Sequence, residues 1–193
     1  DYVLDLKKTD TVVLEISSFQ LESTYQFRPH IGVLLNFSEN HLDRHKGLKE
    51  YFEAKCRLFA NQTQENWAVL NCQQPRIKRL ASTLKAQVSF FNAPQKRRAN
   101  SNPNYLAVID VARILGIPPS VCQEVYEDFK GVEHRMELVR TLDGVDYIND
   151  SKSTTAEATR WGLERLAKPA VRSRFWWRWW LKRQSWSIRP YSW

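Results

Sequence analysis

The pattern of apolar and polar positions predicts alternating strands and helices near the beginning of the chain. Thr11–Ile16 and Ile31–Asn36 are short apolar runs, and such runs are typical of strands that are covered on both faces in a parallel sheet. Between them, residues 17–26 predict a helix whose first turn is capped by Ser17 or Ser18. This order of elements indicates an α/β fold.

The same alternation continues through the middle of the chain. Residues 47–59 predict a helix, and strands are predicted at 67–71 and 87–91. Two further helices, at 105–115 and 119–129, are separated by Gly-Ile-Pro, a sequence that interrupts helices. We therefore expect a parallel sheet covered by helices.

A change of pattern near Gly131 predicts the end of this first unit. Residues 136–140 and 145–149 predict a β-hairpin, because the segment between them contains Asp-Gly, which favours tight turns. A helix from about 154 to 166 follows. Since a hairpin after two helices begins a new sheet, we expect a second unit here.

The charge is unevenly distributed. The chain carries 29 Lys and Arg against 21 Asp and Glu, a formal net charge of +8. Six of the basic residues and six of the eight tryptophans lie in residues 172–193, which contain no acidic residue. The remaining residues then hold 23 basic side chains against 21 acidic ones. The excess charge belongs to the tail, so the rest of the chain gives little reason to expect nucleic acid as a partner.

Several classes of protein do not fit this sequence. It contains neither the roughly 20 consecutive apolar residues of a membrane span nor a signal peptide at residues 1–10, so we expect a cytoplasmic protein. Three cysteines without a CxxC pair argue against a disulfide framework and a zinc site. No two of the six glycines lie within six positions of each other, so the chain has no glycine-rich phosphate-binding motif.

Ionisable residues follow the predicted strands, where ligands bind in open α/β sheets. Glu15 lies near the end of the first apolar run, His41 follows the second, Lys55 lies in the next helix, and Asp150 precedes the last one. Each has a structural alternative: a helix N-terminal carboxylate, a hydrogen-bonded histidine, a solvated helix face and a helix cap, respectively. Together, Glu15 and His41 would point into one crevice and suit a divalent cation that carries phosphate.

Five segments resemble motifs of the Mur ligases. Val13–Glu22, Asn40–His45 and Ala54–Leu58 are similar to the central domain of this family, and Val132–Glu137 and Ile148–Thr154 are similar to the opening of its C-terminal domain. The resemblance implies part of a parallel-sheet, ATPase-type central domain over residues 1–131. It also implies the start of a Rossmann-like C-terminal domain over 132–171, with a non-native tail at 172–193.

The resemblance also implies an activity. Such an enzyme uses ATP and Mg²⁺ to add D-glutamate to a UDP-muramoyl-alanine substrate, by way of an acyl phosphate, in peptidoglycan precursor synthesis. Its partners would be these small molecules, with no nucleic acid and no membrane, and the complete enzyme would be a monomer. Because no phosphate-binding loop is present, we expect the fragment alone to be inactive.

Site residues in the first unit follow from the same resemblance. Glu15 would hold magnesium next to the ATP phosphates, and His41 would hold a second metal. Lys55 matches a carbamylated lysine, whose added carboxylate supplies the oxygen atoms that hard cations prefer. Ser17 and Gln20 would line the muramoyl side of the substrate site.

The remaining predicted site residues would bind the nucleotide or the incoming amino acid. Asn104 matches the second asparagine of an adenine-contacting motif, although Ser101 replaces the first. Arg135 and Asp150 would reach ATP from the second domain. Lys152 would lie near the incoming amino acid and, with His41 and Lys55, would belong to the catalytic residues.

Two alternatives from other functional classes remain open. The chain could be a catalytically inactive interaction protein that keeps the fold. It could also bind nucleic acid or a membrane surface through the tail, because aromatic side chains stack on bases and arginines neutralise phosphates.

We predict that the tail from about Arg172 is a frameshifted translation. Tryptophan has the single codon TGG, so residues 176–180 can be written TGG TGG CGG TGG TGG, and reading one base later gives codons for glycine. The family resemblance implies a glycine-rich segment at this place. Sequencing the coding DNA tests the prediction. A shifted frame that encodes neither glycines nor a family-like domain would show that the tail must be explained as protein.

Overall fold

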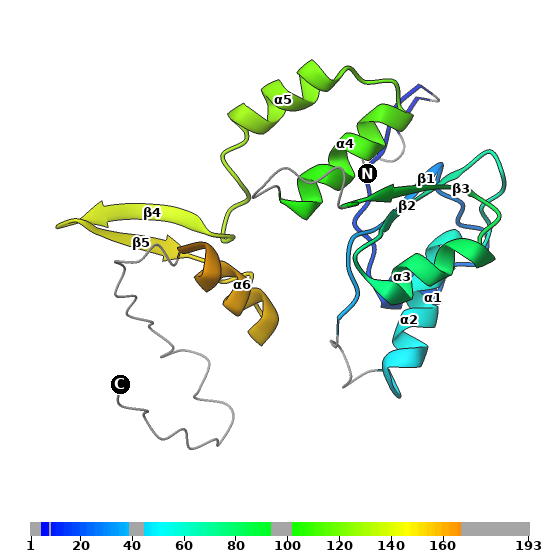
Figure 1. Cartoon of the computed structure of the whole chain (residues 1–193), viewed down its shortest axis with the longest axis horizontal. Coiled ribbons are helices and arrows are strands. Elements are labelled where there is room, and N and C mark those ends of the chain that lie inside the picture. Colours follow the sequence, from blue (N-terminus) through cyan, green and yellow to red (C-terminus); the bar gives the residue numbers. More distant parts are fainter. Residues whose placement is uncertain (1–4, 8, 39–44, 94–101, 167–193) are drawn as a thin grey trace. The chain divides into compact units, whose positions relative to one another are not determined.

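The structure is a computed structural model that describes residues 5–7, 9–38, 45–93 and 102–166 (Figure 1). The chain separates into two compact units, with the division after Phe129. Each unit is described here by itself. None of the helices in the described ranges is long and apolar enough to cross a membrane.

The first unit contains a parallel sheet of three strands. These are β1 (Ile31–Leu34), β2 (Trp67–Asn71) and β3 (Gln87–Phe91), in the order β1-β2-β3. Val33 pairs with Val69 in β2. Three of the four strands predicted for this part of the chain are confirmed, since each of these runs is apolar enough to be covered on both faces.

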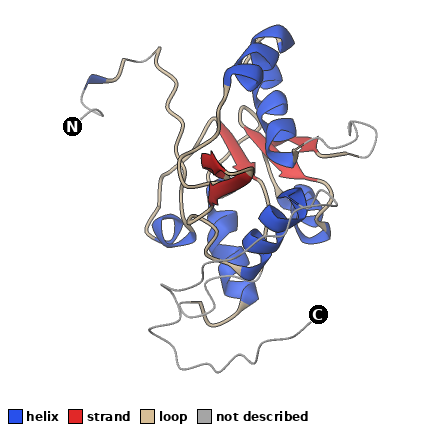
Figure 2. Ribbon diagram, turned by 90° about the vertical axis from the view of Figure 1, so that its left-hand side faces the viewer, coloured by secondary structure: helices blue, strands red, loops and turns tan. Residues whose placement is uncertain are grey.

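Helices cover both faces of the sheet (Figure 2). On one face, Phe59 in the turn after α2 (Leu48–Cys56) and Ile77 in α3 (Pro75–Leu80) pack with Leu70. On the other, Ala107 in α4 (Pro103–Ile114) packs with Val69. The helices of this unit are α1 (Ser18–Glu22), α2 (Leu48–Cys56), α3 (Pro75–Leu80), α4 (Pro103–Ile114) and α5 (Pro119–Asp128), and short 3-10 turns follow α2 (Arg57–Phe59) and α3 (Ala81–Thr83).

Two predictions about the beginning of the chain are wrong. Residues 11–16 form no strand, because a strand needs a hydrogen-bonded neighbour and no described residue supplies one. Val13 is accordingly 92% exposed. Helix α1 ends at Glu22 and not near residue 26, because the Thr24 hydroxyl and the Arg57 guanidinium both donate to the carbonyl of Leu21.

Helix α3 was not predicted. Its six residues are too few to show a clear helical period, and Pro75 at its start supplies the only strong local signal. The other helices occur where the sequence predicts them, with ends shifted by at most three residues, as is usual for helix boundaries.

The second unit contains the predicted hairpin and the predicted helix. Strands β4 (Glu137–Leu142) and β5 (Val145–Asn149) pair antiparallel, and α6 (Ala156–Leu166) follows. Asp143 and Gly144 have φ of 50° and 75°, the left-handed pair that the Asp-Gly turn adopts between twisted strands.

Gly32→Ala is predicted to lower the free energy of unfolding by about 1–3 kcal/mol, the usual cost of overpacking a core. The new Cβ would lie 2.8 Å from Cε1 of Phe59, which is buried. Urea unfolding measures the effect, alone and together with Phe59→Leu. The smaller side chain at position 59 should reduce the cost, and an equal cost in both backgrounds would contradict this explanation.

Candidate functional site

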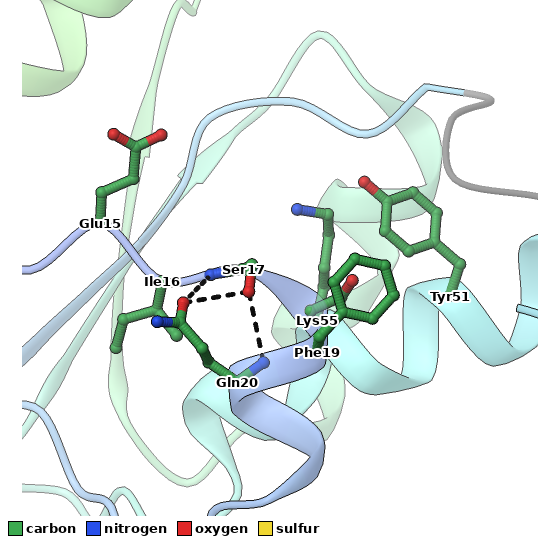
Figure 3. Close-up of a pocket in the computed structure, with 8 residues that line it drawn as sticks. Glu15, Ile16, Ser17, Phe19, Gln20, Tyr51 and Lys55 are labelled. Atoms are coloured by element: carbon green, nitrogen blue, oxygen red, sulfur yellow. Dashed lines mark hydrogen bonds between the residues drawn. The ribbon is translucent and has the colours of Figure 1, made fainter. Parts of the chain in front are cut away.

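A cavity of about 430 Å³ lies where the N-terminal end of α1 meets α2 (Figure 3). One wall is formed by consecutive residues at the entrance to α1, and the other by two side chains one turn apart on α2. The lining residues are Glu15, Ile16, Ser17, Ser18, Phe19, Gln20, Tyr51 and Lys55. Four of the predicted site residues therefore border one space, although they come from two separate motifs.

Ser17 and Gln20 form a reciprocal cap at the start of α1. The backbone N–H of Gln20 donates to the Ser17 hydroxyl, and the Gln20 side-chain carbonyl accepts from the Ser17 backbone N–H at 2.8 Å and from its hydroxyl at 3.0 Å (Figure 3). This capping box satisfies backbone donors that the first turn leaves unpaired. Ser17 is thus the cap, one of the two that the sequence allowed.

Lys55 lies half-buried on α2. Its Nζ lies 5.2 Å from the ring centroid of Tyr51, which is one helical turn earlier. Burial lowers the pKa of the Lys55 amine because the charged form loses hydration. The cavity therefore favours a neutral amine more than an exposed lysine position does.

Glu15 differs from Lys55 in its surroundings. Its carboxylate is exposed and, in Figure 3, is directed away from the capping box. A carboxylate is a suitable ligand for a hard divalent cation, whereas an unmodified lysine amine is not. In the described ranges no group of three or more His, Cys, Asp or Glu side chains could hold a metal ion. His41 lies outside the described residues.

Sequence reasoning missed the aromatic part of the cavity. Phe19 and Tyr51 line it beside the predicted polar residues. The spacing of Tyr51 and Lys55, four residues apart on one helix, would have placed both on one face and could have revealed the pairing.

Asn104 lies at the beginning of α4, with its side chain exposed. Its backbone N–H donates to the side-chain oxygen of Asn102, which caps the helix. Asn104 does not line the cavity, and Ser101 lies outside the described residues.

Arg135 occupies an unusual loop in the second unit. The residues on either side, His134 and Met136, have φ of 65° and 52°, a left-handed backbone that non-glycine residues rarely adopt. Carboxylates hold both of these backbone amides: Glu137 accepts from the N–H of His134 at 2.8 Å, and Asp150 accepts from that of Met136 at 3.0 Å. The loop that carries Arg135 is therefore fixed by neighbouring side chains.

Asp150 and Lys152 belong to the same local structure. The second carboxylate oxygen of Asp150 accepts from the Ser153 hydroxyl, and the backbone N–H of Lys152 donates to the carbonyl of His134 at 3.0 Å. The side chain of Lys152 is exposed. The turn after β5 contains Asp150 and Lys152. Its bonds to the backbone of His134 and Met136 place this turn next to the loop that carries Arg135.

Known proteins similar to this chain point to one family. The Mur ligase middle domain matches residues 2–108. UDP-N-acetylmuramoylalanine–D-glutamate ligase of Pelotomaculum thermopropionicum is 35% identical over 84% of this chain and 42% of its own length. The enzyme of the same name from Lawsonia intracellularis is 39% identical over 89% of this chain and 40% of its own length.

A solved structure supports the fold. MurF from Acinetobacter baumannii matches 69% of this chain and 36% of that chain with a TM-score of 0.57 and 17% identity. The chain spans less than half the length of these relatives. The family match covers more than half of the chain, and the parallel sheet agrees with it: the chain belongs to the Mur ligase family.

Proposed function

We propose that this chain is part of an ATP-dependent ligase that joins D-glutamate to UDP-N-acetylmuramoyl-L-alanine. The observation that carries the proposal is the cavity of Figure 3, which Glu15, Ser17, Gln20 and Lys55 line together. Relatives whose names state this activity align with 84% and 89% of the chain, which further supports it.

The proposed reaction has two steps. A carboxylate oxygen of the muramoyl substrate attacks the γ-phosphorus of ATP, and ADP leaves. The amine nitrogen of D-glutamate then attacks the carbon of the resulting acyl phosphate, the bond between that carbon and the phosphate oxygen breaks, and the nitrogen loses a proton. Both steps place negative charge on oxygen atoms, so positioned cations and N–H donors accelerate them.

Ser17 and Gln20 are assigned to the muramoyl side of the cavity. Since the capping box occupies the carbonyl of Gln20, its side-chain NH₂ is the group that would donate to a substrate. The cap also holds this amide in place before the substrate arrives, so little side-chain entropy remains to be lost on binding.

Glu15 is assigned to magnesium next to the ATP phosphates, His41 to a second metal, and a carbamylated Lys55 to the metal ligands. Bound Mg²⁺ would neutralise charge on the transferred phosphoryl group. Lys55 becomes an oxygen donor only when its neutral amine adds CO₂ and releases a proton. The burial that lowers the pKa of Lys55 favours this neutral amine.

The predicted residues of the second unit are assigned to binding ATP and the incoming amino acid. Arg135 and Asp150 would contact ATP, Lys152 would lie near D-glutamate, and Asn104 of the first unit would contact adenine. Asp150 would also act indirectly, because its bond to the Met136 amide fixes the backbone that presents Arg135.

A chimeric enzyme tests the activity. Residues 5–166 of this chain replace the aligned segment of the Pelotomaculum thermopropionicum ligase, and phosphate release is measured with ATP, UDP-N-acetylmuramoyl-L-alanine and D-glutamate. We expect D-glutamate-dependent turnover on the order of 1 per second, as for an ordinary enzyme. In the same chimera, Lys55→Ala should abolish turnover and short carboxylates should partly restore it, because they can occupy the position of the carbamate.

Lys49→Ala is the matched control for that substitution. Lys49 lies on the same helix, but its side chain is 87% exposed, so turnover should stay near that of the unsubstituted chimera. A folded chimera without D-glutamate-dependent phosphate release contradicts the proposed function. An active chimera that tolerates Lys55→Ala contradicts only the role of Lys55.

Carbamylation of Lys55 is testable by ¹³C NMR of this chain in ¹³C-bicarbonate. Because the pKa of Lys55 is lowered, its neutral amine and hence its carbamate should appear at lower pH than those of an exposed lysine. Lys55→Met should remove a side-chain carbamate signal that appears at lower pH than those of the exposed lysines and is distinct from that of the N-terminal amine, whereas Lys49→Met should leave it. Equal spectra of the two variants would refute this modification.

A further inference from the structure

His45 is the most buried ionisable side chain next to the cavity, and the proposed function gives it no role. Its side chain is 1% exposed. It lies in the segment that precedes α2 in the sequence. Its ring packs between α1 and α2. Its Nε2 lies 3.0 Å from the Ser18 hydroxyl, and its Nδ1 lies 3.4 Å from a carboxylate oxygen of Glu22.

These two contacts give the imidazole a consistent tautomer. The Glu22 carboxylate can only accept, so a proton on Nδ1 faces it and leaves Nε2 to accept from the Ser18 hydroxyl. Ser18 and Glu22 are four residues apart and lie on one face of α1. The ring of His45 therefore meets that face at two points, through a hydrogen bond to Ser18 and through the longer approach of Nδ1 to Glu22, which is not a hydrogen bond.

Ring stacking connects His45 to both walls of the cavity. Its ring is parallel to that of Phe19, with the centroids 5.2 Å apart and an interplanar angle of 7°, and it lies 5.0 Å from the ring of Tyr51. Ser18, Phe19 and Tyr51 all line the cavity, whereas His45 does not. His45 thus lies directly behind the cavity and contacts one residue of α2 and several of α1.

Helix α1 depends on such support. Its five residues are too few for a stable helix, because isolated helices in water need about 12 or more residues. Arg57 holds its C-terminal end through the carbonyls of Leu21 and Thr24. His45 contacts the cavity-lining residues of the helix, through a hydrogen bond to Ser18 and ring stacking on Phe19.

We propose that His45 is a positioning residue, which fixes helix α1 against helix α2 and thereby sets the distance between the capping box and Lys55. The inference rests on the proposed function only for what the cavity binds. The positioning itself can be measured without any ligand.

The order Glu22, His45, Ser18 also resembles the connectivity of a catalytic triad. A nucleophile must reach its substrate, but Ser18 is only 3% exposed and its hydroxyl is directed at the buried imidazole. The burial of Ser18 and His45 favours a positioning role over a nucleophilic one.

Amide hydrogen exchange on the 193-residue chain tests the proposal. In His45→Ala, the amides of Leu21 and Ser23, which close α1, should exchange at least about tenfold faster relative to those of Val69 and Leu70 in β2. The ε-methylene resonance of Lys55, which lies near the Tyr51 ring, should also move as that ring loses its neighbour. His45→Gln retains a hydrogen-bonding partner for Ser18 and should show the same changes to a smaller extent.

Gln62→Leu is the matched control. Gln62 is equally buried, and its side chain donates to the carbonyls of Pro29 and Trp67, away from the cavity. Its substitution removes a bond to β2 and should therefore leave the exchange of the α1 amides and the Lys55 resonance unchanged, even where exchange in β2 accelerates. If His45→Ala does not fold, His45→Gln provides the measurement. Equal acceleration of α1 and β2, or no change in α1, would overturn the proposal, while failure of the chimeric ligase alone would not.

Discussion

The complete burial of the middle of strand β2 is the constraint on which the first unit depends. Ala68, Val69 and Leu70 have no exposed surface, so strands must occupy both hydrogen-bonding edges and apolar side chains must cover both faces. An unpaired buried amide would cost about 1–3 kcal/mol. Parallel partners need a crossover for each connection. Because both crossovers proceed across the sheet in the same direction, α2 and α3 lie on one face, and α4 is left to cover the other.

The carboxyl ends of the strands are joined by side-chain amides where the backbone ladder stops. Asn71 donates to the carbonyl of Leu35 and accepts from Asn92, and Gln74 accepts from the backbone N–H of Phe37. These bonds connect the ends of β1, β2 and β3. They also fix the backbone at Leu35 and Phe37, the residues through which the chain leaves β1.

How much of this the sequence predicts depends on how local the cause is. Strands at 67–71 and 87–91 and the Asp-Gly hairpin follow from residues close together in the chain, and all are correctly predicted. Residues 11–16 carry an equally good apolar run, but a strand requires a neighbour, which no local pattern can supply. The candidate site follows the same rule. The motifs predict Glu15 and Lys55 as site residues. His45 is not predicted, because its contacts with Phe19 and Tyr51 form only in the folded chain.

The burial of Lys55 carries a cost in stability. Its pKa is lowered in the folded chain, so between that value and the ordinary 10.5 the unfolded chain binds more protons. The contribution of this residue to the free energy of unfolding therefore rises with pH through that interval, and the penalty is fully present at lower pH. The next residue shows the same environment, since burial raises the pKa of the Cys56 thiol to about 11. A methionine would fill the position of Lys55 without this penalty. A half-buried amine that lines the same cavity as the exposed carboxylate of Glu15 fits the role proposed above for Lys55, in which the amine itself reacts.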